Sequence, residues 1–214
     1  MRRSFGRFLT MEGIEGVGKT TQVARISTTL AQRGIAHVVT REPGGTALAE
    51  KIRELLLNPS GETLPSMAEL LLMFAARAAH LANHIEPSLR AGRWVLCDRF
   101  TDATYAYQGA GRGMNRADIQ FLENAVQGTR RPDLTLLLDV PVAVGLQRSQ
   151  QRDAGTIRDR FERERADFFE RVRGEYLRRA RAEPDRIEII DGTASEDEVW
   201  ARILAVLESK SWMS

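Results

Sequence analysis

The chain has little cysteine, little net charge and no long apolar run. Its single cysteine, Cys97, cannot close an internal disulfide, and this suits a reducing compartment. Lysine and arginine total 31 against 29 aspartates and glutamates, and this near balance lacks the overall basic excess of a nucleic-acid-binding protein. No stretch approaches the roughly 20 apolar residues of a membrane helix. Residues 1–7 are basic without a following apolar region, which indicates a short solvated tail. We expect a cytoplasmic protein with no nucleic-acid or membrane partner.

Strand-like and helix-like segments alternate along the chain, without an internal repeat or a dividing linker. We expect five strands, at 8–12, 37–40, 94–97, 134–138 and 187–190. We expect helices from 20 onward and at 47–57, 66–90 with a bend at Pro87, 115–127, 141–152, 161–182 and 195–209. This alternation predicts an α/β fold in which helices flank a five-stranded parallel sheet, with residues 1–214 as a single domain.

The segment from Gly13 to Thr20 carries the most specific motif, a complete G-x-x-x-x-G-K-T between an expected strand and an expected helix. Glycines let successive backbone N–H groups point at one phosphate, and the helix N-terminus adds its positive dipole end. Lys19 is expected to reach the β- and γ-phosphates, and the Thr20 hydroxyl to bind Mg²⁺. The predicted ATP-binding residues are Gly13, Glu15, Gly16, Val17, Gly18, Lys19, Thr20 and Thr21.

A phosphate-binding loop alone does not identify a reaction, because GTPases, transporters, recombinases and kinases share it. The chain has no Asn-Lys-x-Asp for guanine recognition and no Leu-Ser-Gly-Gly-Gln of transporter ATPases. Four further segments stand out, three of them at expected strand ends, where ligands of open parallel sheets bind. They are Thr40–Thr46, with the run Arg-Glu-Pro-Gly-Gly, then Phe74–His80, Asp98–Gly109 and Leu138–Pro141.

In the order and spacing of these motifs the chain resembles the thymidylate kinase family in its bacterial form, over roughly residues 8–210. The resemblance implies a P-loop NTPase fold with an arginine-bearing lid at about 150–161, and usually a homodimer. It implies phosphoryl transfer from ATP to dTMP with Mg²⁺, giving dTDP and ADP for dTTP synthesis. Such an acceptor is already an anion near neutral pH, because the second pKa of a phosphomonoester is about 6. The reaction therefore needs cations rather than a general base, and the sequence supplies arginines.

The resemblance also assigns roles to individual residues. The catalytic set is Lys19, Asp98, Arg99, Arg152 and Arg160, with Thr20 and Asp98 holding the metal. The dTMP set is Glu15, Glu42, Pro43, Met73, Phe74, Arg77, Arg99, Thr104, Tyr107 and Gln108. Within it, Arg99 would clamp the acceptor phosphate, Arg77 would contact the thymine edge, and Tyr107 would crowd a 2′-hydroxyl.

Several alternatives stay open from the sequence. Either Met73 or Phe74 covers the base, and either Arg152 or Arg160 reaches the transferred phosphoryl group, with Arg152 preferred. A deoxynucleoside kinase or another nucleoside monophosphate kinase on the same scaffold is the nearest rival function, and a regulatory NTPase is a more distant one. His80 and His84 lie four residues apart without a third metal ligand nearby, and we interpret them as ordinary helix residues.

Overall fold

The five strands form one parallel sheet in the order β2-β3-β1-β4-β5. The computed structural model describes residues 6–57, 63–152, 160–161, 164–210 and 212, without the side chain of Arg152. The strands are β1 (Phe8–Glu12), β2 (His37–Arg41), β3 (Trp94–Asp98), β4 (Leu134–Asp139) and β5 (Ile187–Asp191). The predicted α/β fold with a five-stranded parallel sheet is confirmed, and all five expected strands are present.

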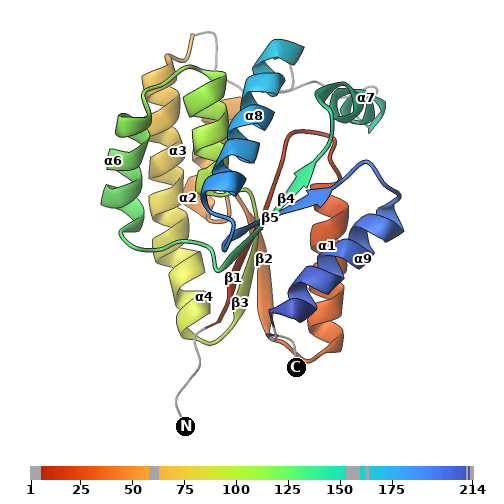
Figure 1. Ribbon diagram of the computed structural model, residues 1–214. Coiled ribbons are helices and arrows are strands. Elements are labelled where there is room, and N and C mark those ends of the chain that lie inside the picture. The colour runs from red at the N-terminus through yellow and green to blue at the C-terminus, as the bar shows by residue number, and fades with distance from the viewer. Residues whose placement is uncertain (1–5, 58–62, 153–159, 162–163, 211, 213–214) are drawn as a thin grey trace.

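Helices cover both faces of the sheet (Figure 1). On one face lie α1 (Lys19–Gln32) and α9 (Glu196–Ser209). The other side carries α2 (Ala47–Leu57), α3 (Ser66–His80), α4 (Glu86–Arg90), α6 (Arg116–Gln127) and α8 (Ala166–Ala182). Helix α7 (Val142–Arg152) follows β4 and lies near the carboxyl ends of the strands.

The central strand β1 is buried along its whole length, and its alternate side chains pack in different hydrophobic clusters. Leu9 and Met11 belong to the cluster that includes Ile26 of α1, whereas Phe8 packs with Leu89 of α4. Alternate residues of a strand point to opposite faces, so this split follows from the sequence of β1. The same alternation places Thr10 and Glu12, both fully buried, on the face of Phe8. No helix in the described ranges is long and apolar enough to cross a membrane.

The long helix expected at 66–90 is interrupted, and the interruption has a local cause. Between α3 and α4 the backbone forms a π-helical turn, η1 (Leu81–Ile85). Pro87 has no N–H to donate to the carbonyl of Asn83, and its ring crowds that carbonyl, so the preceding turn widens. A second π-helical segment, η2 (Tyr105–Gly111), continues the short helix α5 (Thr101–Thr104) directly after β3. Two of the predicted acceptor-site residues, Tyr107 and Gln108, lie on η2.

Candidate active site

The loop between β1 and α1 is shaped by glycines in the left-handed region, at Gly16 (φ 74°) and Gly18 (φ 96°). A Cβ atom on Gly16 would lie 2.0 Å from the carbonyl oxygen of Gly145, so only glycine lets the loop pack under α7. Gly18 instead faces open space and caps α1 without a side-chain hydrogen bond. The N-terminal end of α1 therefore keeps backbone N–H groups for an anion.

Lys19 occupies the first turn of α1 and is held by the loop itself. Its Nζ donates to the carbonyl oxygens of Gly13 at 3.0 Å and Ile14 at 2.8 Å. Burial, with the positive charge of Arg99 nearby, lowers the pKa of the Lys19 ammonium to about 8. A polyphosphate in this position would supply the negative charge that the buried ammonium lacks, so the loop is built for an anion.

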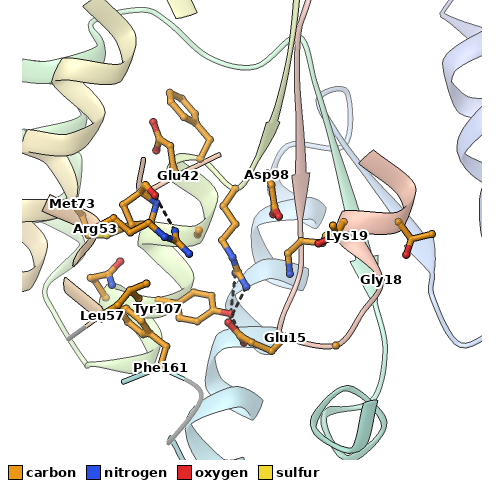
Figure 2. Close-up of a pocket in the computed structure, with 18 of the residues that line it drawn as sticks. Glu15, Gly18, Lys19, Glu42, Arg53, Leu57, Met73, Asp98, Tyr107 and Phe161 are labelled. Atoms are coloured by element: carbon orange, nitrogen blue, oxygen red, sulfur yellow. Dashed lines mark hydrogen bonds and ion pairs between the residues drawn. The ribbon is translucent and has the colours of Figure 1, made fainter. Parts of the chain in front are cut away.

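A cavity of about 570 Å³ opens in front of this loop (Figure 2). Gly18, Lys19 and Asp98 lie on one side of it, and Arg53, Leu57 and Met73 lie on the other. Glu15 and Tyr107 lie between these two sides, where their polar ends meet (Figure 2). The cavity thus has a loop side, made by residues 13–21, and a far side, made by side chains from α2, α3 and η2.

Arg99 stands where the two sides meet. It follows β3 directly and has φ 67°, the left-handed region that non-glycine residues rarely occupy. Its guanidinium donates to Glu15 Oε1 at 2.8 Å and to the Tyr107 hydroxyl at 2.9 Å. That hydroxyl in turn donates to Glu15 Oε2 at 2.7 Å. The acid in the phosphate-binding loop thus points away from the phosphate position and holds the arginine that faces it.

A second buried arginine lies behind the far wall of the cavity. Arg77 Nε donates to Glu42 Oε2 at 2.7 Å, and Arg77 NH2 donates to Thr104 Oγ1 at 3.0 Å. Its remaining terminal nitrogen, NH1, is buried without a partner in the structure. A buried guanidinium nitrogen has a strong need for an acceptor, so Arg77 is one hydrogen bond short of satisfaction.

His80 is part of the same network, which the sequence did not reveal. Its Nδ1 lies 3.1 Å from Glu42 Oε1, and its Nε2 lies 2.7 Å from Thr40 Oγ1. The imidazole is fully buried, so it joins the Arg-Glu-Pro-Gly-Gly segment to α3. The spacing of His80 and Glu42 in the sequence gives no sign of this contact, because it depends on how α3 packs beside β2.

One carboxylate oxygen at the loop side fits a divalent cation. Asp98 Oδ1 is buried and accepts no hydrogen bond from the part of the chain that the structure describes, and Asp98 lines the cavity together with Thr20. Among the described residues no group of three or more acidic, histidine or cysteine side chains could hold a metal alone. A Mg²⁺-sized cation there would take most of its ligands from phosphate oxygens and water, as is usual for nucleotide-bound magnesium.

Most predicted site residues lie along this cavity. The lining includes Glu15, Gly16, Gly18, Lys19, Thr20, Thr21, Glu42, Pro43, Met73, Asp98, Arg99, Tyr107 and Gln108. Six other described residues of the predicted set lie outside its lining, namely Gly13, Val17, Phe74, Arg77, Thr104 and Arg160. Of the two base-stacking alternatives, Met73 thus faces the cavity, whereas Phe74 is buried. The Cζ atom of Arg77 lies over the Phe74 ring, 4.9 Å from the ring centroid.

Of the two expected lid arginines, the structure describes the side chain of Arg160 alone. The side chain of Arg152 lies outside the described residues. Arg160 pairs with the buried carboxylate of Glu69 on α3, which also accepts a hydrogen bond from Gln108 at 2.6 Å. The structure therefore places Arg160 at α3 rather than at the phosphate-binding loop.

Two lining arginines were missed by the sequence reasoning as binding residues. Arg53 of α2 lies on the far side of the cavity and donates to the carbonyl of Pro43 at 2.9 Å. Arg148 of α7 borders the loop side and donates to the carbonyl of Gly192 at 2.9 Å. Neither belongs to a local motif, and only the packing of α2 and α7 around the sheet brings them to the cavity.

This fold and site define a P-loop kinase, in which a triphosphate-binding loop faces an arginine-lined pocket for a second anion. The family model described as thymidylate kinase matches residues 11–203. Thymidylate kinase from Chromohalobacter salexigens is 56% identical over 210 residues, covering 97% of this chain and 98% of that protein. The enzyme from Hahella chejuensis is 51% identical, covering 96% and 97%.

A solved structure agrees with these relatives. The crystal structure of thymidylate kinase from Ehrlichia chaffeensis aligns with a TM-score of 0.74 and 34% identity, covering 95% of this chain and 99% of that one. The chain belongs to the thymidylate kinase family.

Proposed function

We propose that this chain transfers the γ-phosphoryl group of ATP to the 5′-phosphate of dTMP, with Mg²⁺, and releases dTDP and ADP for dTTP synthesis. The observation that carries this proposal is a cavity with an anion-binding loop on one side, Arg53 on the other side and Arg99 where the two sides meet. Two polyanions in one cavity require positioning and charge neutralisation rather than proton abstraction, and cationic side chains provide both. The sequence of the family and the geometry of this cavity point to the same chemistry.

On the loop side we assign the triphosphate to the backbone of residues 13–18 and to Lys19, Thr20 and Thr21. Lys19 would exchange its two carbonyl partners for phosphate oxygens, which restores the charge that burial disfavours. Thr20 and the unpartnered Asp98 Oδ1 would hold Mg²⁺, which neutralises phosphate charge when bound. We keep Arg152 as the proposed lid contact to the transferred group, within a lid at 150–161 of one kinase domain spanning 1–214.

On the far side we assign dTMP to the pocket between Arg99 and Arg77. Arg99, with Arg53, would hold the 5′-phosphate, and Glu15 and Tyr107 would face the deoxyribose. Arg77 NH1, which is buried without a partner, would donate toward the thymine edge beyond Thr104. Met73 would cover the base, and Glu42, Pro43 and Gln108 would complete the pocket walls.

The first experiment is ADP release from ATP and Mg²⁺ with dTMP, dUMP, dCMP, dGMP or thymidine as acceptor. We expect fast turnover with dTMP, slower turnover with dUMP and none with thymidine, because thymidine lacks the phosphate that Arg99 would bind. Turnover with thymidine but not dTMP would instead indicate a nucleoside kinase, with Glu15 or Glu42 as its base. Acceptor-independent hydrolysis would indicate a regulatory NTPase.

We further propose that the enzyme is a homodimer formed through α2, α3 and α6, and that it works in the cytoplasm. These helices carry exposed apolar side chains, with Phe121 of α6 71% exposed and Leu71 of α3 50% exposed. Adjacent exposed apolar residues on neighbouring helices are typical of an interface. Sedimentation of the wild type against Phe121→Glu tests this, with a dimer expected for the former and a monomer for the latter.

A further inference from the structure

Glu12 is a buried carboxylate with no role assigned so far. It is the last residue of β1 and has no exposed surface, and it does not line the cavity. Burying a carboxyl group is costly unless its oxygens are hydrogen-bonded. Both Glu12 oxygens have partners, one in the backbone next to Arg99 and the other in the side chain of Tyr176. The first of these partners is bonded to Arg99 through the peptide link, and the second lies beside the Arg99 guanidinium.

The first partner fixes the backbone of Arg99. The Arg99 N–H donates to the Met11 carbonyl at 2.9 Å, which continues the pairing of β3 with β1. The next N–H, of Phe100, donates to Glu12 Oε1 at 2.7 Å, so the acceptor beyond the end of β3 is a side-chain oxygen rather than a backbone carbonyl. Arg99 lies between these two bonds with φ 67°. The Glu12 carboxylate thus secures the turn that aims the arginine into the cavity, a turn that an L-residue does not favour by itself.

The second partner limits the side chain of Arg99. The Tyr176 hydroxyl of α8 donates to Glu12 Oε2 at 2.7 Å. The oxygen of that hydroxyl lies 3.5 Å from Arg99 NH1, on a guanidinium that also donates to the Gly13 carbonyl, Glu15 and Tyr107. Glu12 therefore orients the hydroxyl so that its oxygen, rather than its proton, faces the guanidinium.

We propose that Glu12 is a positioning residue that holds Arg99 in the conformation that binds the acceptor phosphate. This inference rests on the proposed function, because it gives Arg99 the phosphate-binding role stated above. Glu12 itself touches neither substrate, and its effect passes through the Arg99–Phe100 peptide and through Tyr176.

Burial and the cationic and hydrogen-bonding groups around Glu12 act in opposite directions on the pKa of its carboxyl. Burial, together with the nearby negative charge of Asp102, raises the pKa of the Glu12 carboxyl to about 8. Lys19 and Arg99 also face this carboxyl, and the Tyr176 hydroxyl bonds to it.

The test compares Glu12→Gln with Thr10→Val as a matched control. Thr10 lies two residues earlier on the same face of β1, is also fully buried, and shares a 2.7 Å hydrogen bond with Thr135. The dissociation constants of dTMP and of a non-hydrolysable ATP analogue are measured by calorimetry, with thermal unfolding recorded for each variant. For Glu12→Gln we expect dTMP binding to weaken by about tenfold or more, with ATP-analogue binding nearly unchanged, because the glutamine amide has one acceptor oxygen and cannot accept from both the Phe100 N–H and the Tyr176 hydroxyl. For Thr10→Val we expect both dissociation constants to stay within about twofold, because the hydrogen-bond partner of Thr10 is Thr135, which is not a partner of Arg99.

A double-mutant cycle with Arg99→Ala separates positioning from general loss of structure. If Glu12 acts through Arg99, the Glu12→Gln/Arg99→Ala protein binds dTMP as weakly as Arg99→Ala alone. Additive effects, or an equal loss of dTMP and ATP-analogue binding in Glu12→Gln, overturn the proposal. If Glu12→Gln does not fold, Tyr176→Phe replaces it in the cycle, since it removes only the hydroxyl. A wild-type protein that does not bind dTMP would instead overturn the proposed function.

Discussion

The two sides of the cavity are built in different ways. The loop side comes from one run of residues, 13–21, and it presents mainly backbone groups and one lysine to its ligand. The far side draws side chains from α2, α3 and η2, and Arg77 behind it and Arg99 beside it are held by carboxylates distant in sequence. A phosphate-binding loop needs only local geometry, whereas acceptor recognition needs the packed fold. Substitutions on the loop side should therefore lower turnover with every acceptor, and substitutions on the far side should weaken only the binding and turnover of dTMP.

The largest effect is expected for Lys19→Ala on the loop side. Removing a buried cation that stabilises charge in the transition state costs about 10²–10³-fold in turnover, and Lys19 is placed to reach the transferred phosphoryl group itself. We expect at least this loss in kcat with dTMP and with dUMP alike, measured as ADP release. Direct dTMP binding should remain within about twofold, because Lys19 lies across the cavity from the acceptor pocket. A loss confined to one acceptor would contradict the division between the two sides.

A smaller and selective loss is expected for Arg99→Ala. The value of kcat/KM for dTMP should fall by about 10²-fold, mainly through KM, because a guanidinium partner of the acceptor phosphate is lost. Binding of an ATP analogue should stay nearly unchanged. Arg90→Ala serves as a control, since Arg90 is exposed at the end of α4, where it pairs with Glu86. An unchanged response to dTMP in Arg99→Ala would remove the proposed phosphate clamp.

The same division explains how much the sequence predicted. The phosphate-binding loop and all five strands were predicted correctly, because their signals lie within short runs of residues. Arg53 and His80 were missed, since their contacts to Pro43 and Glu42 arise only when α2 and α3 pack beside β2. The π-helical turn at 81–85 was also missed, although Pro87 indicated a disturbance there. Arg160 was the second choice, after Arg152, for contact with the phosphoryl group, and no pattern in the sequence indicated its observed partner, Glu69, which is 91 residues away.

A pH titration distinguishes the two sides without changing the acceptor pocket. In the free enzyme the pKa of Lys19 is lowered from 10.5 to about 8 by burial and by Arg99. ATP favours the charged ammonium, so ATP affinity should be constant below pH 8 and weaken above it, by up to about tenfold per pH unit. Calorimetry with an ATP analogue from pH 7 to 9.5 measures this. Lys19→Arg should abolish the decline, because a guanidinium keeps its proton throughout. A flat wild-type profile would show that Lys19 stays fully charged in the free enzyme.

The smallest effects are expected at Met73 and Phe74, and they decide which one covers the base. Met73 borders the cavity, whereas Phe74 is 2% exposed and packs with Leu70, Tyr105 and Ile119. Met73→Ala should therefore raise the KM for dTMP by about fivefold, from the loss of part of an apolar contact with the base. Phe74→Leu should lower the free energy of unfolding by about 1 kcal/mol or more and leave the KM within twofold, because it removes volume from the core rather than from the cavity wall. If Phe74→Leu instead raised the KM more than Met73→Ala, the ring would act on the base through Arg77, which it touches from below. Recognition of the base would then depend on Phe74, which lies behind the residues that line the cavity.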